Sequence, residues 1–565
     1  MPISSRWTIP LQVCSIPTYL FGPPGATVPD KPAFYDADRP DTHFLTIASF
    51  RTWSQRFAAG LQKAGLKPGD RVLLFSGNNL FYPVAFMGVL MAGGIFTGAN
   101  PGFVVRELAY QLKDADAKFL ICADASLEIG IEAATSVGMG KDRVFLFDDK
   151  LFEGTGESRL DIQNWKNLVE SEKMGKSFRW FEPRDSKNST CCLNYSSGTT
   201  GVPKGVEITH FNYVANATQF IHMGTLHPDF EAKAATAKVL CFLPMYHAMA
   251  QAIFISVAPK RQIPVYIMKK FDFVKVLESV QKFRITSLTM VPPVVVLLAK
   301  SPLTKKYDLS SVVDIGSGAA PLSGEVIEEA EALWPTGDRK MKASEGTPQR
   351  KYQSLMKMCQ IARVGHDRSH LLTAWLGSPP GINPQLNGET EVALGERGEI
   401  WVNAPNIMKG YWRNPKATQE IFVDAPDGRW MRTGDIAYVD DKGHFFIVDR
   451  MKELIKVKGN QVAPAELEAV ILEHPQIADS CVVGVTINGE EVPRAYIVPR
   501  QGEKPVESEI VNWMAKRVAR HKRLLGGVVL VDAIPKNPSG KILRKILRER
   551  AKEEVGDKDP ERAKL

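Results

Sequence analysis

The run YSSGTTGVPKG at residues 195–205 combines small hydroxyl residues, glycines and a lysine. Glycine lets the backbone approach an anion closely, so the N–H groups around Gly198 and Gly201 can wrap phosphate oxygens. Lys204 adds a positive charge. The hydroxyl groups that would donate further hydrogen bonds belong to Ser196, Ser197, Thr199 and Thr200. The spacing is not that of the Walker loop, and a flexible linker rarely keeps such an order between an apolar stretch and a helix-like run. We therefore interpret the run as a phosphate-binding loop of another type.

Five further motifs follow this loop along the chain. They are PMYH at 244–247, GSGAAPL at 316–322, RTGD at 432–435, DRMKELIKVKG at 449–459 and PKNPSGK at 535–541. Taken singly, each has an ordinary structural explanation. Asp435 would be a turn residue, His247 a half-buried core histidine, and Lys541 a solvated lysine in a lysine-rich stretch. Their common order is what gives them a chemical meaning.

Together the six motifs resemble, in the same order, those of the acyl-adenylate-forming superfamily, which includes acyl-CoA synthetases, 4-coumarate:CoA ligases and firefly luciferases. The resemblance covers about residues 45 to 550, and the stretch VDRMKELIKVKGNQVAPAELE is most similar to the 4-coumarate:CoA ligase-like branch. It implies an ATP-dependent, AMP-forming carboxylic acid:CoA ligase that activates an aryl or fatty acid through acyl-AMP. The cofactors it implies are ATP, Mg²⁺ and the co-substrate coenzyme A.

The resemblance also implies roles for individual residues. Lys541 would stabilise charge during adenylation, and the carboxyl-terminal domain would turn about a hinge at Lys452. The residues implied in the thioester-forming step are His247, Lys456 and Gln461. Coenzyme A would contact Lys260, Lys458 and Gly459. The residues implied to bind ATP or AMP are Ser196, Ser197, Gly198, Thr199, Thr200, Gly201, Lys204, Gly318, Ala319, Ala320, Pro321, Asp435 and Arg450.

One family segment is missing. After the adenine motif the family carries Gly-aromatic-Gly-Met-Thr-Glu, whose Thr contacts the α-phosphate and whose Glu holds Mg²⁺. No such segment stands between residues 322 and 399, so the metal ligands of this chain are unknown. Glu345 and Asp367 lie in this stretch, but neither has the family context. Simple divergence into a degenerate enzyme would explain the loss.

A retained intron explains it better. Residues 363–370, RVGHDRSH, can be encoded by CGG GTG GGG CAT GAC CGA AGT CAC, and the same bases read one position later give GWGMTEVT. Lys342 and the two residues after it can be encoded by AAG GCA AGT, which resembles a rare splice donor, and residues 361–362 by ATA GCA, which contains an acceptor-like TAG. We hypothesise that the bases between these points are an intron and that a second disruption restores the frame before residue 391. Amplification of the spliced transcript tests this, and a transcript that keeps the present reading throughout would reject it.

Apolar spacing indicates the elements that position these motifs. Residues 49–64 and 80–92 have helical spacing, and residues 71–75 form an apolar strand between glycine and proline breaks, which predicts an α/β layer with a parallel sheet. Similar alternation recurs at 239–243, 274–283 and 285–291. From residue 399 the pattern changes to short strands, with turns at 427–428 and 442–443. A helix at 465–473 and strands at 481–485, 495–498 and 528–531 predict a small α+β unit.

By resemblance the fold class is α/β in two domains. A large amino-terminal AMP-binding (adenylation) domain over residues 1–449 would hold two α/β layers and a small β-barrel. A hinge over 450–452 would lead to a mobile α+β domain over 453–565. A chain of 565 residues is too long for one core, which agrees with this division.

Composition limits the partners and the compartment. The formal net charge is +8, which favours anionic substrates, and we expect no nucleic acid partner. Seven cysteines without a CxxC pair indicate reduced thiols inside the cell, and no apolar run is long enough to span a membrane. The ending Ala563-Lys564-Leu565 is a close variant of the Ser-Lys-Leu address, which predicts binding to the peroxisomal import receptor and location in the peroxisome matrix.

Two other functions stay open. A luciferase-like adenylating oxygenase would use the same adenylation machinery and the same peroxisomal ending. A catalytically impaired relative would follow from the disrupted segment at residues 343–390.

Overall fold

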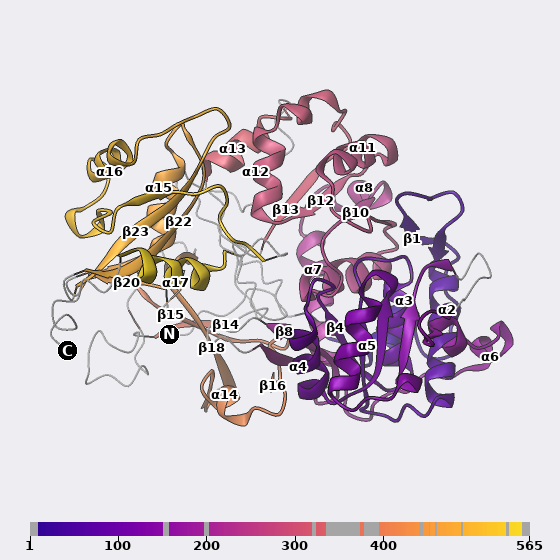
Figure 1. Ribbon diagram of the computed structural model, residues 1–565. Helices are drawn as coiled ribbons and strands as arrows, with labels where there is room; N and C mark the ends of the chain where they lie inside the picture. The colour runs from indigo at the N-terminus through magenta and orange to yellow at the C-terminus, as the bar shows by residue number, and fades with distance from the viewer. Residues whose placement is uncertain are drawn as a thin grey trace.

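The amino-terminal part of the chain is built on an eight-stranded sheet, whose strands are drawn in indigo to magenta in Figure 1 except for the orange β16. The computed structural model describes residues 9–150, 158–196, 203–318, 324–334, 373–377, 392, 395–426, 428–439, 445–450, 453–457, 460–487, 490–537 and 542–555. The strands lie in the order β16-β9-β8-β4-β3-β5-β6-β7, and every neighbouring pair is parallel except β8–β9 and β9–β16, so β9 alone runs in the opposite direction. Their bounds are β3 Arg71–Phe75, β4 Ile95–Ala99, β5 Ala117–Ala123, β6 Val144–Phe147, β7 Gln163–Asn164, β8 Thr190–Ser196, β9 Lys204–Thr209 and β16 Gly410–Tyr411.

Helices cover both faces of this sheet, so β3 is buried along its whole length. Val72 and Leu74 belong to one core cluster, whereas Leu73 and Phe75 belong to another, as the alternation of a strand requires. Helices α2 (Ile47–Lys63) and α3 (Tyr82–Met91) pack on the first face. Helices α4 (Val105–Ala115) and α5 (Leu127–Ser136) pack on the second. The elements predicted over 49–64, 71–75 and 80–92 are therefore confirmed.

A second sheet of six strands lies beside the first. Its order is β13-β12-β10-β11-β1-β2, and every pair except β1–β2 is parallel. The strand bounds are β1 Pro32–Asp36, β2 Phe44–Thr46, β10 Val239–Cys241, β11 Val265–Ile267, β12 Ser287–Met290 and β13 Asp314–Ser317. The predicted alternation at 239–291 corresponds to β10, to helix α11 (Phe273–Phe283) and to β12.

The carboxyl ends of the two parallel sheets are fastened together by one side chain. Asn78 follows β3 of the first sheet, and its amide donates to the carbonyl oxygens of Leu243 (3.0 Å) and Met268 (3.1 Å), which follow β10 and β11 of the second. Its Oδ1 accepts from the Met245 N–H at 2.9 Å. In open α/β sheets ligands bind outside these carboxyl ends, so the junction is where a site is expected.

A third sheet is antiparallel and has five strands. Strand β18 (Gly428–Val439) pairs with three neighbours, β15 (Gly398–Asn403), β17 (Phe422–Ala425) and β19 (Phe445–Arg450), and β15 pairs with β14 (Thr373–Gly377). Strands β15, β17, β18 and β19 lie in the part of the chain, from residue 399, for which short strands were predicted.

Residues from 455 onward form cores of their own, drawn in yellow in Figure 1. Strands β22 (Ile477–Ile487), β23 (Glu490–Pro499) and β24 (Val528–Leu530) make one sheet, and β20 (Ile455–Val457) pairs with β21 (Asn460–Val462). The helices here are α15 (Pro464–Leu472), α16 (Glu507–Ala515) and α17 (Arg544–Val555). The helix and strands predicted for this α+β unit are confirmed, and α15 contacts β19 of the third sheet.

The remaining helices complete the architecture. They are α1 Ile16–Phe21, α6 Glu172–Ser177, α7 His210–Thr225, α8 Phe230–Ala235, α9 Ala248–Ala250, α10 Ala258–Lys260, α12 Pro292–Lys300, α13 Gly324–Glu331 and α14 Pro415–Gln419. Among the described helices none is long and apolar enough to cross a membrane. The six described cysteines are free thiols, as predicted.

Candidate active site

The phosphate loop predicted from the sequence joins two paired antiparallel strands, β8 and β9, which we call the phosphate hairpin. Ser196 ends β8 and lies opposite Lys204, which begins β9. The loop is therefore followed by a strand before α7, where a helix-like run was expected, because Val206 and Ile208 alternate with polar residues in a β pattern. Predicted residues Ser197, Gly198, Thr199, Thr200 and Gly201 lie outside the described residues.

Helix α4 contacts both ends of this loop. The hydroxyl of Tyr195 donates to Asp114 Oδ2 at 2.6 Å, and the hydroxyl of Tyr110 donates to the Pro203 carbonyl at 2.8 Å. Burial, together with the bond to Asp114, raises the pKa of Tyr195, so its hydroxyl stays a neutral donor. Sequence reasoning missed Asp114 and Tyr110, because only the folded sheet brings α4 next to the β8–β9 hairpin.

The segment between β15 and β17 also contacts the phosphate hairpin. Strand β16 pairs with β9, and the Trp412 N–H donates to the Gly205 carbonyl at 2.8 Å. This places the Tyr411 ring with its centroid 5.2 Å from Lys204 Nζ, within cation–π range. The Tyr411 ring is therefore a partner of the predicted phosphate-binding lysine.

His247 follows β10 and begins the short helix α9. Its Nδ1 accepts from the Met249 N–H at 3.4 Å, a weak cap. Solvent reaches the side chain, yet the surrounding protein is dense enough that desolvation lowers the pKa of the imidazole. The ring is therefore neutral at pH 7 and able to exchange a proton.

A buried polar cluster links the segment after His247 to the phosphate hairpin. The fully buried Gln251 accepts at Oε1 from Asn194 Nδ2 (3.1 Å) and from the Tyr213 hydroxyl (2.6 Å). Asn194 is on β8, directly before the loop, whereas Tyr213 is on α7. The cluster fixes the spacing between His247 and the phosphate hairpin.

The RTGD segment lies on β18 around a buried carboxylate. Glu399 Oε1 accepts from the Gly434 N–H (3.0 Å), and Oε2 accepts from Arg432 Nε (3.0 Å). Gly434 has φ +69°, a conformation that favours glycine. Asp435 is buried and lies directly opposite Arg450 in the β18–β19 ladder, so the structure brings these two predicted nucleotide residues together. Sequence reasoning missed Glu399, although a carboxylate inside a buried strand is itself a signal, since it needs partners.

The adenine motif begins at the end of β13. Gly318 is the last of its residues that the structure describes, and its N–H donates to the Met290 carbonyl at 3.3 Å. Ala319, Ala320 and Pro321 lie outside the described residues, as does the disrupted stretch 343–390 apart from β14. Since β13 and β10 belong to the same parallel sheet, Gly318 and His247 stand at the same edge.

In the carboxyl-terminal unit, Lys456 and Gln461 are cross-strand partners in the β20–β21 ladder. Lys456 is exposed, and its N–H donates to Glu491 Oε2 at 2.8 Å. The structure thus brings together two residues predicted for thioester formation. Lys452, Lys458, Gly459 and Lys541 lie outside the described residues.

Lys260 has a structural partner. Its ammonium donates to the Tyr19 carbonyl at 2.5 Å and lies 4.3 Å from the centroid of the Tyr19 ring, so it fastens α1 to α10. Burial lowers the pKa of this lysine. A contact with coenzyme A would have to replace the bond to Tyr19, and it stays a prediction.

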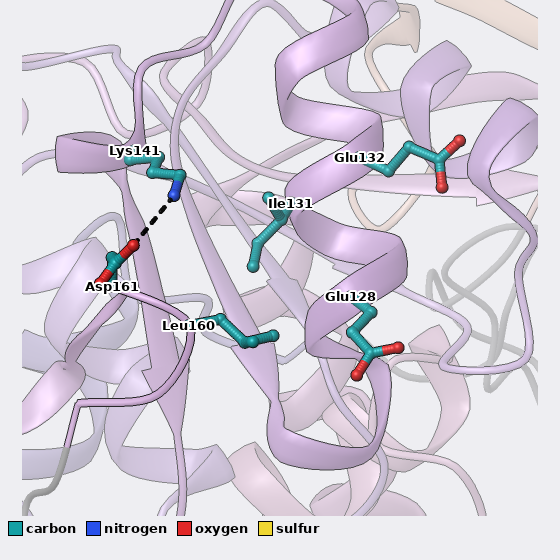
Figure 2. Close-up of a pocket in the computed structure, with 6 residues that line it drawn as sticks. All are labelled: Glu128, Ile131, Glu132, Lys141, Leu160 and Asp161. Atoms are coloured by element: carbon teal, nitrogen blue, oxygen red, sulfur yellow. Dashed lines mark ion pairs between the residues drawn. The ribbon is translucent and has the colours of Figure 1, made fainter.

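A surface hollow also lies away from these motifs. Figure 2 shows a groove of about 360 Å³ between α5 and the turn at residues 159–162, where Lys141 pairs with Asp161 at 3.6 Å. Glu128 and Glu132 add two further carboxylates. ATP and coenzyme A are polyanions, so this acidic groove does not suit them. In the described ranges no group of three His, Cys, Asp or Glu side chains is placed to hold a metal ion.

Comparison with known proteins agrees with this geometry. A family model described as AMP-binding enzyme matches residues 24–412, and one described as AMP-binding enzyme C-terminal domain matches residues 466–541. A probable 4-coumarate–CoA ligase 1 of Dictyostelium discoideum is 34% identical over 550 residues, covering 93% of this chain and 96% of that protein. The phenylacetyl-CoA ligase epaB of Aspergillus niger is 34% identical and covers 93% and 95%. The crystal structure of ATP-bound MatB from Rhodopseudomonas palustris superposes with a TM-score of 0.77 at 25% identity, covering 96% of this chain and 99% of the other.

Proposed function

Because the chain belongs to the AMP-binding enzyme family, we propose that it is an ATP-dependent, AMP-forming carboxylic acid:CoA ligase. The observation that carries the proposal is the junction at Asn78. It joins the carboxyl ends of two parallel sheets, where the phosphate hairpin, His247 and Gly318 all stand. Asp435 and Arg450 are paired on β18 and β19, and by the family resemblance they would bind the ribose of the same nucleotide.

The reaction has two steps. A carboxylate oxygen attacks the α-phosphorus of MgATP, the bond between the α-phosphorus and the bridging oxygen breaks, and pyrophosphate leaves. The thiolate of coenzyme A then attacks the acyl carbonyl, and AMP leaves. Neutral His247 is suited to the second step, since a neutral imidazole can accept the thiol proton.

The acid is proposed to be an aryl acid, with fatty acids as the second class. The support is that the similar proteins include ligases named for 4-coumarate and phenylacetate. A panel of cinnamates, phenylacetates and fatty acids is assayed for pyrophosphate release, together with coenzyme A and O₂ consumption. Coenzyme A consumption that matches pyrophosphate release is expected. O₂ consumption without coenzyme A consumption would instead establish the oxygenase.

A catalytically impaired relative is the second candidate, and the observation that favours it is the absent Gly-x-Gly-Met-Thr-Glu segment. Its Glu would fix Mg²⁺ against the phosphates, and that charge neutralisation is a large part of the chemistry. We therefore expect the chain as written to exchange pyrophosphate far more slowly than a variant with HGWGMTEVT restored after Lys342. The two proteins are compared at equal folded concentration. Equal rates would show that the segment is dispensable and that the chain is a competent ligase.

The proposed location is the peroxisome matrix, reached through the import receptor. Support comes from the ending Ala563-Lys564-Leu565, which lies after a polar stretch of the chain. A fluorescent protein fused to the amino terminus should enter peroxisomes, and the same fusion without the three residues should stay cytosolic. If both fusions stay cytosolic, the ending is not an address.

A further inference from the structure

We propose that Asp114 and Tyr110 of α4 are positioning residues that clamp the two ends of the phosphate hairpin, and that their contacts set the affinity for a nucleoside triphosphate. The inference rests on the proposed function, because it assigns the hairpin to ATP. It concerns residues that lie outside every motif singled out in the sequence.

The two clamp residues lie on the same face of helix α4. Residues 110 and 114 are four apart in α4, so their side chains lie on the same face, one turn from each other. Asp114 accepts from Tyr195, the residue directly before Ser196 on β8, at 2.6 Å. Tyr110 donates to the carbonyl of Pro203, the residue directly before Lys204 on β9, at 2.8 Å. One helix therefore holds the entry and the exit of the glycine-rich turn.

Fixing the two ends of a glycine-rich loop should strengthen its binding to phosphate. Glycine loses more backbone entropy on ordering than other residues, so a loop with free ends would lose much of its binding energy in becoming fixed. Fixing both ends in advance removes part of that cost. The β8–β9 ladder pairs Ser196 with Lys204, and the contacts from α4 hold the residues directly before each of them.

The chemistry of Asp114 excludes a direct role in phosphate binding. A carboxylate repels phosphate oxygens, and the Asp114 carboxylate is bound by a hydroxyl that burial keeps protonated. Burial, followed by the nearby Asp114 charge, also raises the pKa of Tyr110, so both tyrosines are neutral donors. Arg413 is one cation near Tyr195, and its guanidinium pairs with Asp116 at 3.2 Å.

The test is nucleotide binding by the full chain, measured calorimetrically with ATP and with AMP in the presence of Mg²⁺. ATP offers the hairpin three phosphates and AMP one, so loss of the clamp should weaken ATP binding more. We expect Asp114→Ala and Tyr195→Phe to lose about 10-fold or more in ATP affinity and less than about 3-fold in AMP affinity. Asp114→Asn keeps an oxygen acceptor and should lose less. Asp161→Asn, a carboxylate that is 91% exposed, is the charge-matched control and should change neither affinity.

A second measurement separates the clamp from the proposed function. Hydrogen exchange of the peptide 195–206 is compared in the free wild-type, Asp114→Ala and Asp161→Asn proteins, with peptides of β3 as the internal reference. Faster exchange of 195–206 in Asp114→Ala alone is expected. Unchanged exchange there, or an equal loss of ATP and AMP affinity, would overturn the clamp. A wild-type protein that binds neither nucleotide would instead reject the proposed function, while the exchange result would still decide the clamp.

Discussion

The guanidinium of Arg544, at the start of α17, stands between two buried carboxylates. It lies 3.0 Å from Glu453 and 2.5 Å from Glu468, and the three side chains are only 10–12% exposed. Glu468 also accepts from the Val482 N–H at 2.8 Å, which ties α15 to β22. Glu453 directly follows the predicted hinge, and Arg544 comes three residues after Lys541. The cluster therefore couples the hinge end of the unit to the end that carries the predicted adenylation lysine.

Substitution Arg544→Gln should destabilise this unit strongly. It leaves two buried carboxylates without their cation, and breaking a buried ion pair from one side costs about 3–5 kcal/mol. Lys545→Gln is the matched control, because it removes one positive charge from the next residue of the same helix. Lys545 is 69% exposed and lies 3.7 Å from Glu549, so its loss should cost less than about 0.5 kcal/mol.

Native-state hydrogen exchange of the β23 amides at residues 495–497 measures the difference. A loss of about 3–5 kcal/mol accelerates their exchange by roughly two to three and a half orders of magnitude, since 1.36 kcal/mol is tenfold. The double variant Arg544→Gln with Glu468→Gln should recover part of the loss, because one unpaired charge is gone. The reasoning fails if Arg544→Gln exchanges within about threefold of Lys545→Gln.

Two further predictions follow from the catalytic and the buried groups. Lys541→Ala in an active version should lower acyl-AMP formation by about 10²–10³ while thioester formation from supplied acyl-AMP survives; equal loss of both steps would contradict its role. His210 is fully buried, and burial lowers the pKa of its imidazole to about 3, below the unfolded value of 6.5. The folded state therefore resists protonation of His210, so the contribution of this group to the free energy of unfolding should be constant above pH 6.5 and fall as the pH drops toward 3, by up to about 1.4 kcal/mol per pH unit. Urea unfolding at pH 8 and pH 5 should show this fall in the free energy of unfolding of the wild-type protein and a smaller fall in His210→Gln. Equal falls in the two proteins would refute the prediction.

Local patterns of this sequence predicted the elements well. Helix α2 has a capping box at Thr46 and a regular apolar face, and β3 has four apolar residues after Arg71, so propensity, capping and burial agree. The family itself was also predicted correctly, because each motif is a short continuous stretch of the sequence. These are the features that need no knowledge of tertiary contacts.

The supporting residues could not be predicted because their partners are distant in sequence. Asp114 lies 81 residues from Tyr195, and Glu399 lies 35 residues from Gly434. Lys260 is a further case, since it was predicted to contact coenzyme A, and the sequence did not reveal its partner Tyr19, which is 241 residues away. A polar side chain in an apolar strand predicts that a partner exists, but only the fold tells which one.

The disrupted stretch affects chemistry and architecture differently. Strand β14 lies just after residues 363–370 and pairs with β15 along its five residues, from Thr373 opposite Asn403 to Gly377 opposite Glu399. Such a ladder is made of backbone groups, so it forms with many sequences, whereas a phosphate or metal contact depends on particular side chains. The contacts that hold the phosphate hairpin, the sheet junction and the RTGD segment come from Asp114, Asn78 and Glu399, all outside residues 343–390. The chain as written should therefore fold and bind ATP even if adenylation is slow, and loss of both ATP binding and folding on making it would contradict this separation.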